Sequence, residues 1–235
     1  MKFLIIIGVF LLPVFLLSKE VVNKGNSLEI LSPFEDILVK IESQYDKEDL
    51  EKYVKKLEKN IKIPKGMLHT LIVMESNYQH KAINPKDPNR GVAVTSYGLG
   101  QLTEDTAWDV CGLFKDELYD PFKNIECSAK LVKYQLNRYK KDISYAVAAY
   151  NAGTPCVCDG VYYKRPMWDY KLKKTVEGIC YVDASFTDHV VFGSRKKMRN
   201  PVEAKCGIFE IGKFLNQEYV DKFYSLWNGK DIKYL

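Results

Sequence analysis

Apolar side chains recur every three or four residues in several stretches of this chain, and this period predicts amphipathic helices. Residues 47–60 show it after Asp46, which is a favourable N-cap residue. Residues 63–79 show it with Pro64 in the position of a first helical turn. The remaining helical stretches are residues 34–43, 103–110 after the cap Thr103, 120–139 after the cap Asp120, 142–153 and 214–227.

The pattern changes between residues 154 and 212. This region is rich in Gly, Pro, aromatic and basic residues, holds four of the six cysteines, and has no long periodic stretch. We therefore predict a mainly α fold in which a cysteine-bearing irregular insert precedes the last helix. The predicted parts are an N-terminal signal (residues 1–18), a helical prelude (19–60), a main helical domain (61–153), the insert (154–212) and a C-terminal helix that completes the main domain (213–235).

A short apolar run opens the chain. Residues 1–18 place Lys2 before about fifteen apolar residues, which is the pattern of a bacterial export signal. The run is shorter than the roughly 20 residues of a membrane span, and Pro13 would kink a helix. We expect an exported protein of the periplasm or cell envelope, and an uncleaved membrane anchor through residues 3–18 is the alternative. Because no cysteine ends the run, a lipoprotein is disfavoured.

The charge of the chain favours an anionic surface over nucleic acid. The net charge is +5 with a pI near 8.7, and Lys and Arg are interspersed with Asp and Glu rather than gathered into a patch. Such a balance supports loose attraction to a cell wall and is too weak to indicate nucleic-acid binding.

Six cysteines in an exported chain are expected to form disulfides, in a pairing that the sequence leaves open. A zinc site built from the last four cysteines is the alternative. The single residue between Cys156 and Cys158 is shorter than the usual spacer in such sites, which disfavours it. The three histidines form no His-Glu-x-x-His arrangement, so we expect no catalytic metal and no cofactor.

Glu75 is a carboxylate inside an apolar stripe. At about 100° per residue it points close to Leu71, within the apolar arc of residues 63–79. Contact with apolar surface disfavours the charged form, so the pKa of Glu75 should rise toward neutrality, as a general acid requires. The alternative is a glutamate at the rim of the stripe whose head group reaches water.

Two other segments accompany Glu75-Ser76, and these are residues 96–101 (Ser-Tyr-Gly-Leu-Gly-Gln) and residues 149–153 (Ala-Tyr-Asn-Ala-Gly). Taken singly, they are also compatible with a glycine turn and an ordinary helix end around a core tyrosine. In this order and spacing, the three segments resemble the lytic transglycosylase family with the soluble-type, lysozyme-like catalytic domain. Members of that family carry Glu-Ser, Gly-Leu-Met-Gln and Ala-Tyr-Asn-Ala-Gly. The resemblance covers residues 61–153, and Tyr219-Val220 resembles the Tyr-Val of the closing helix of the family.

The resemblance implies a site as well as a lysozyme-like fold. Glu75 matches the single catalytic acid of the family. Gly100 stands where the family has methionine, which is expected to remove apolar bulk from the sugar groove. The stretch between the first two motifs is longer than is common in the family, so the rim of the groove is expected to differ. The residues expected to bind substrate are Ser76, Ser96, Leu99, Gln101, Tyr150 and Asn151.

The implied reaction cleaves the β-1,4 bond between N-acetylmuramic acid and N-acetylglucosamine in peptidoglycan glycan strands. Glu75 would act first as acid and then as base, giving a 1,6-anhydro product. Because Glu104 and Asp105 follow the glutamine motif, a second carboxylate and lysozyme-type hydrolysis are the enzymatic alternative. A non-catalytic wall-binding component of an envelope secretion or pilus machine is the alternative from another class.

Overall fold

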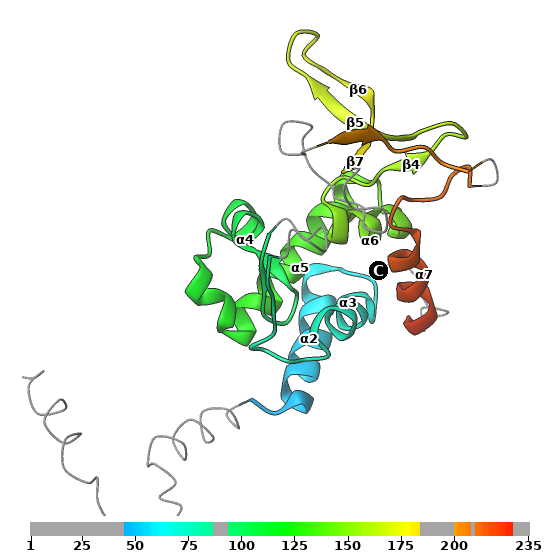
Figure 1. Cartoon of the computed structure of the whole chain (residues 1–235). Helices are drawn as coiled ribbons and strands as arrows, with labels where there is room; N and C mark the ends of the chain where they lie inside the picture. The colour runs from blue at the N-terminus through cyan, green and yellow to red at the C-terminus, as the bar shows by residue number, and fades with distance from the viewer. Residues whose placement is uncertain (1–44, 87–93, 184–199, 208–209, 228–235) are drawn as a thin grey trace, which may run out of the picture. The chain divides into compact units, whose positions relative to one another are not determined.

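The computed structural model describes residues 45–86, 94–183, 200–207 and 210–227 (Figure 1). All of these belong to one compact unit, Tyr45–Leu235. The predicted export signal and the helix expected over residues 34–43 lie outside the described residues.

The helices that the sequence predicts from residue 47 onward are present. The three expected N-caps form, since Asp46, Thr103 and Asp120 accept backbone N–H groups of the first turn, and Asp142 caps its helix in the same way. Two starts differ from expectation. The last helix begins at Gln217 and not at residue 214. The helix that carries Glu75 begins at Met67, because Pro64 lies in a preceding turn where its carbonyl accepts the Met67 N–H. The helices are α2 (Lys47–Ile61), α3 (Met67–Ser76), α4 (Glu104–Cys111), the 3-10 helix η2 (Lys115–Tyr119), α5 (Pro121–Arg138), α6 (Ile143–Ala152) and α7 (Gln217–Leu226).

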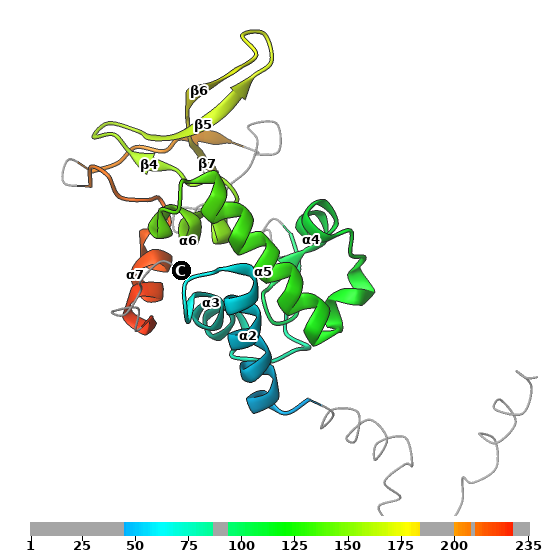
Figure 2. The ribbon, with the colours of Figure 1, turned by 180° about the vertical axis from the view of Figure 1, so that it is seen from behind.

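Helix α5 packs against four other helices, α2, α3, α4 and α6, and α6 in turn packs against α7 (Figures 1 and 2). The small side chains of α6, residues 146–149, are all buried, which lets its neighbours approach closely. The predicted mainly α, lysozyme-like fold class is confirmed. The main core is built from apolar residues of α2, α3, α5, α6 and α7, among them Leu50, Val54, Leu68, Leu71, Ile125, Val132, Val147, Val220 and Phe223.

Three short strands form a small antiparallel sheet of order β1-β2-β3, which the sequence did not predict. They are β1 (Ile83–Asn84), β2 (Ser96–Tyr97) and β3 (Leu102–Thr103). Ser96 pairs with Thr103 and Tyr97 with Leu102, so residues 98–101 form the turn of a hairpin. The glutamine motif is therefore a tight loop held between two strands.

The insert contains regular strands where an irregular chain was expected. One sheet joins β4 (Val157–Cys158), β5 (Tyr163–Asp169) and β6 (Lys174–Ile179), and a second pairs β7 (Tyr181–Asp183) with β8 (Pro201–Glu203). The alternation that marks strands is weak in this sequence, because the hairpin β5–β6 is exposed along most of its length.

All six cysteines form disulfides, as expected from their number and the predicted export. Cys111–Cys127 joins α4 to α5 within the helical part. Two bridges, Cys156–Cys180 and Cys158–Cys206, cross-link the insert. The insert also pairs with the chain that leads into α7, since the Cys158 N–H donates to the Lys213 carbonyl (2.9 Å) and the Leu215 N–H to the Cys156 carbonyl (2.9 Å).

Within the described part of the chain, none of the helices combines the length and the apolar character that crossing a membrane requires.

Candidate active site

The helix that carries Glu75 is fixed at its N-terminus by a buried glutamate of α2. The N-cap residue Gly66 offers no side chain, and Glu58 takes over this role. Its carboxylate accepts the N–H groups of Gly66 (2.7 Å), Leu68 (2.8 Å) and His69 (3.1 Å). Free N–H groups at a helix start attract an anion, so the buried Glu58 stabilises α3 and sets its direction.

Glu75 lies in the last turn of α3, which ends at the left-handed residue Asn77. Its Oε1 accepts a hydrogen bond of 2.5 Å from the Tyr219 hydroxyl, and Tyr219 belongs to α7. Burial raises the pKa of Glu75 to about 7, against the opposing effects of the Tyr219 hydroxyl and the positive charge of Lys222. The predicted rise in the pKa of this carboxyl group is therefore present, and burial is its main cause.

Tyr150 of α6 is the third member of this partly buried group. Burial and the negative charge of Glu75 raise the pKa of both Tyr150 and Tyr219, so each hydroxyl stays protonated. The Tyr150 hydroxyl donates to the carbonyl of Gly100 (2.8 Å). Tyr150 therefore connects the acid on α3 to the glutamine-motif loop.

The loop is also tied to α3 directly. The Ser76 hydroxyl donates to the Leu99 carbonyl (2.8 Å), and both side chains are buried. In the described structure these two residues hold the loop beside Glu75. Their expected contacts with substrate stay a prediction.

Gln101 is locked within the hairpin turn. Its backbone has a φ of 48°, and its side-chain oxygen accepts from the Ser96 hydroxyl (2.9 Å). Its side-chain NH₂ donates to the carbonyls of Gly98 (2.8 Å) and Ala82 (3.2 Å). The amide is thus held in one orientation before any ligand arrives.

Asn124 of α5 is a residue of this site that the sequence analysis missed. It is fully buried, and its Oδ1 accepts the Gly100 N–H (2.8 Å) while its Nδ2 donates to the Tyr97 and Leu118 carbonyls (3.0 Å each). A signal was present, because Asn124 is a polar residue on the apolar side of the α5 stripe. Buried amides of this kind need partners, and the loop backbone supplies them.

Gly100 does not leave the gap that was expected. A Cβ atom added there would lie 1.9 Å from Ser128 Oγ and 2.7 Å from the Tyr150 hydroxyl oxygen. The space that a methionine needs is filled by side chains of α5 and α6. The replacement therefore changes the packing under the loop, and the expectation of a groove with less bulk at this position is corrected.

Asn151 sits at the exposed end of α6, next to α7. Its Oδ1 accepts from Asn216 Nδ2 (3.0 Å), which also donates to the Ala148 carbonyl (3.1 Å). The structure therefore brings Glu75, Tyr150 and the loop together, and it gives Asn151 a contact that helps to position the start of α7.

The two carboxylates considered as partners of Glu75 face another surface. Glu104 accepts from the Tyr97 hydroxyl (3.1 Å), and Glu104 and Asp105 line a shallow depression on α4 with the exposed Trp108. Neither is among the groups that shift the pKa of Glu75. Among the residues that the structure describes, there is also no cluster of His, Cys, Asp and Glu side chains that could hold a metal ion.

The helical domain thus holds a partly buried acid, Glu75, at the end of α3, with the glutamine-motif loop tied to the same helix, and this arrangement fits the lysozyme-like fold class. Residues 52–166 match the family described as Transglycosylase SLT domain. This part of the chain is thus a transglycosylase SLT domain, and the family resemblance stated from the motifs is confirmed. The family supports a glycan-cleaving function of the lytic transglycosylase type and implies peptidoglycan as the substrate that is bound.

Among solved structures, the chain is similar to one titled "Bd0314 DslA wild-type form 2". The two chains are 19% identical over an alignment that covers 48% of this chain and 76% of that chain, with a TM-score of 0.31.

Proposed function

We propose that this protein is a lytic transglycosylase that cleaves the β-1,4 bond between N-acetylmuramic acid and N-acetylglucosamine, with Glu75 as its only catalytic carboxyl group. The observation that carries the proposal is the burial of Glu75, which raises its pKa to about 7. A carboxyl group with such a pKa is half protonated near neutral pH. It is therefore suited to give up a proton and take one back.

In the proposed reaction, protonated Glu75 donates its proton to the glycosidic oxygen. The bond to the anomeric carbon of N-acetylmuramic acid breaks, and positive charge develops at that carbon. The carboxylate left behind takes the proton of the muramyl 6-hydroxyl as this oxygen attacks the anomeric carbon. The products are a 1,6-anhydro sugar and a free 4-hydroxyl on N-acetylglucosamine, and no water is consumed.

The surroundings of Glu75 support one carboxylate rather than two. Its neighbours are the hydroxyl of Tyr219 and the positive charge of Lys222. The Tyr219 hydroxyl donates to Glu75, so it favours the charged form that has just lost its proton. A glycosidase that activates water through a second carboxylate needs that group on the other side of the bond. Glu104 is the nearest candidate in sequence, and it is engaged with Tyr97.

The other matched residues are proposed to bind the sugar from the loop and from the end of α6. Gln101 and Ser96 form one rigid unit at the hairpin turn, and Asn151 is exposed at the end of α6. Ser76, Leu99 and Tyr150 are proposed to act mainly by holding the loop against α3. Rigid support of this kind keeps a substrate oriented toward the acid.

The test is digestion of purified peptidoglycan followed by mass measurement of the soluble fragments. We expect fragments lighter by one water than the reducing fragments of a hydrolase, and a loss of cleavage on the order of 10³-fold in Glu75→Gln. Glu104→Gln is the matched control and should cleave as the wild type does.

Each other result has a definite meaning. Reducing products only, together with a loss of cleavage in Glu104→Gln, would establish lysozyme-type hydrolysis. Unchanged cleavage in Glu75→Gln would remove Glu75 from the reaction. Absence of cleavage by the wild type, with retained binding to the wall, would favour the non-catalytic component of an envelope machine.

Three disulfides fit an oxidising compartment, so we propose that the protein acts outside the cytoplasm, in the cell envelope. Localisation is tested by alkylating free thiols in intact cells with a reagent that adds mass. The exported, oxidised protein should gain no mass unless it is first reduced.

A further inference from the structure

The hairpin β5–β6 ends in a turn that the proposed glycan-cleaving site does not use. Strand pairing runs from Lys164 opposite Ile179 to Asp169 opposite Lys174, so residues 170–173 close the hairpin. We call residues 168–174 the hairpin tip. In both ribbon views the hairpin extends away from the helices (Figures 1 and 2).

The hairpin tip presents three large apolar side chains to solvent. Trp168 is 54% exposed, Tyr170 85% and Leu172 59%. Apolar groups gathered at one exposed point mark a surface that binds something, since leaving them in water is unfavourable. Trp and Tyr are the residues that concentrate at the boundary between lipid and water, because their rings are apolar and their N–H and O–H groups are polar.

The hairpin tip is also positively charged. It contains Lys171, Lys173 and Lys174, all exposed, and within the described residues none of them forms an ion pair. Its only acidic residue, Asp169, accepts the backbone N–H groups of Lys171 (2.8 Å) and Leu172 (3.0 Å). The lysine head groups are therefore free to contact an anionic partner.

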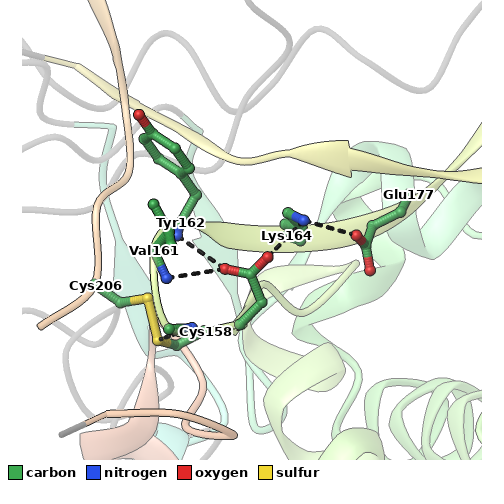
Figure 3. Close-up of polar contacts among 8 residues, drawn as sticks. Cys158, Val161, Tyr162, Lys164, Glu177 and Cys206 are labelled. Atoms are coloured by element: carbon green, nitrogen blue, oxygen red, sulfur yellow. Dashed lines mark hydrogen bonds and ion pairs between the residues drawn. A yellow bond between two sulfur atoms is a disulfide. The ribbon is translucent and has the colours of Figure 1, made fainter. Parts of the chain in front are cut away.

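The base of the hairpin differs from its tip in the ion pairing of its lysine. Figure 3 shows Lys164 directed toward Glu177, at 2.9 Å, and Lys164 also contacts Asp159 at 2.5 Å. Asp159 in turn accepts the N–H groups of Val161 and Tyr162 (3.0 Å each), beside the Cys158–Cys206 disulfide. Lys164 is thus paired with two carboxylates where the hairpin joins the insert, whereas the three lysines of the hairpin tip form no ion pair with any residue that the structure describes.

The hairpin tip is held in shape before it meets a partner. The Asp169 carboxylate fixes the turn, and the Met167 side chain lies over Gly178 on the opposite strand. A preorganised surface loses little conformational entropy on binding. The exposed aromatic residues are therefore presented by a fixed hairpin.

We propose that the hairpin tip inserts into the head-group region of an anionic lipid bilayer. Trp168, Tyr170 and Leu172 enter the boundary with the acyl chains, and the three lysines contact lipid phosphates. The chemistry favours lipid over glycan, because the surface is convex and includes aliphatic Leu172. Sugar sites are concave and are lined with hydrogen-bonding groups. The inference does not depend on Glu75.

The test uses the full-length chain and vesicles of equimolar phosphatidylglycerol and phosphatidylethanolamine with brominated acyl chains. Bromine quenches tryptophan fluorescence at short range, so we expect the vesicles to quench the protein. Trp168→Phe should lose this quenching, because the remaining tryptophans belong to the helical part. Residues 1–18 are also apolar, so sedimentation with vesicles does not identify the hairpin tip, whereas quenching of Trp168 does.

A second variant keeps Trp168 as the fluorescent reporter and removes the positive charges that attract anionic lipid. The triple change Lys171→Gln, Lys173→Gln and Lys174→Gln should raise the lipid concentration for half-maximal quenching by on the order of a hundredfold, from about fivefold per lysine near an anionic surface. The matched control is the triple change Lys55→Gln, Lys56→Gln and Lys59→Gln on α2, where the same number of exposed lysines is removed and quenching should persist.

Three results would overturn the proposal. The first is quenching that survives Trp168→Phe. The second is equal quenching by neutral phosphatidylcholine vesicles. The third is an absence of quenching together with weaker binding of the triple tip variant to purified peptidoglycan, which would assign the hairpin tip to glycan.

Discussion

The helical domain and the insert are stabilised in different ways. The helical domain buries leucine, isoleucine, valine and phenylalanine side chains from five helices, α2, α3, α5, α6 and α7, in one core. The buried cluster of the insert consists of Tyr163, Ala204 and three cysteines, with little other apolar surface. A region with so small a core needs covalent cross-links, and two disulfides supply them. Within one chain, the helical domain thus depends mainly on burial, with one disulfide of its own, and the insert depends mainly on disulfides.

The two parts meet at α7. The insert pairs with residues 213–215 just before this helix, and α7 carries Tyr219 back to Glu75. The stability of the insert should therefore affect the proposed acid, although none of the described strands of the insert contacts it through a hydrogen bond.

Removal of the longest disulfide loop should affect the insert most. Cys158 and Cys206 are 48 residues apart, and closing such a loop stabilises a fold by about 4 kcal/mol in the chain-entropy description. The double variant Cys158→Ser, Cys206→Ser should lose amide protection in β4 and β5 and should cleave peptidoglycan more slowly, with the helical circular dichroism retained.

The matched control is Cys111→Ser with Cys127→Ser, where the separation is 16 residues and the bridge lies within the helical domain. It should lower the unfolding temperature of the helices and leave the protection of β4 unchanged. If both double variants lose amide protection in the same segments, the helical domain and the insert unfold as one unit and are not stabilised separately.

Glu75 should lower the stability of the helical domain in a pH-dependent way. Its pKa is raised from 4.5 to about 7 in the folded state, so the unfolded chain ionises first as the pH rises. The free energy of unfolding of the helical domain should therefore fall as the pH rises from about 4.5 to 7, by roughly 3 kcal/mol at most. Glu75→Gln should be more stable than the wild type in urea at about pH 8 and nearly equal to it at about pH 4.

The control for this change is Glu104→Gln on the exposed surface of α4, which should show no such difference. An equal stability of Glu75→Gln and wild type at both pH values would mean that Glu75 is solvated, as in the alternative of a glutamate at the rim of the stripe.

Gly100→Ala should destabilise the helical domain by about 2 kcal/mol, because overpacking in a well-filled interior usually costs 1–3 kcal/mol. The added Cβ would overlap Ser128 Oγ. Combining it with Ser128→Gly should recover part of the loss, and a thermodynamic cycle from urea unfolding measures the coupling. If the changes in the free energy of unfolding are additive, the loop moves away from α5 and the added Cβ does not contact Ser128.

Tyr219→Phe should have the smallest effect and lower the rate of peptidoglycan cleavage about tenfold. A loss of this size corresponds to the free energy of one hydrogen bond to a charged group. The Tyr219 hydroxyl lowers the pKa of Glu75, so its removal should raise that pKa above about 7. Because the proposed acid must be protonated, the fall in rate at high pH should then move to higher pH. Tyr224→Phe on the same helix, where the hydroxyl contacts Ser144, should leave the profile in place. An unchanged pH–rate profile in Tyr219→Phe would mean that the Tyr219 hydroxyl does not influence the pKa of Glu75.

The sequence predicted the helices well, because capping residues and a period of 3.6 are local signals. Asp120 before Pro121 predicted the start of α5, and Gly153 the end of α6. The strands of the insert were missed because the exposed hairpin shows no buried face with alternating residues. The start of α3 was misplaced because Glu58, ten residues upstream, supplies a cap that no local pattern reveals.

For the site, the sequence located Glu75 and predicted the direction of its pKa shift from the apolar neighbours in its own helix. It did not identify Asn124 or Ser128, which act through backbone contacts and close packing with a loop more than twenty residues away. Tyr219 was noted as part of a motif, yet its hydrogen bond to Glu75 depends on the folded arrangement of α3 and α7. Contacts between residues that are distant in sequence produce no periodic pattern from which they could be predicted.

The contact between Glu75 and Tyr219 joins residues 144 positions apart. Chains are made from the N-terminus, so α3 and its carboxyl group exist long before the ribosome reaches α7. Four cysteines of the insert lie in the intervening chain and form the two bridges that cross-link it. Glu75 therefore gains the hydroxyl of Tyr219 as a partner only after all of the intervening residues have been synthesised.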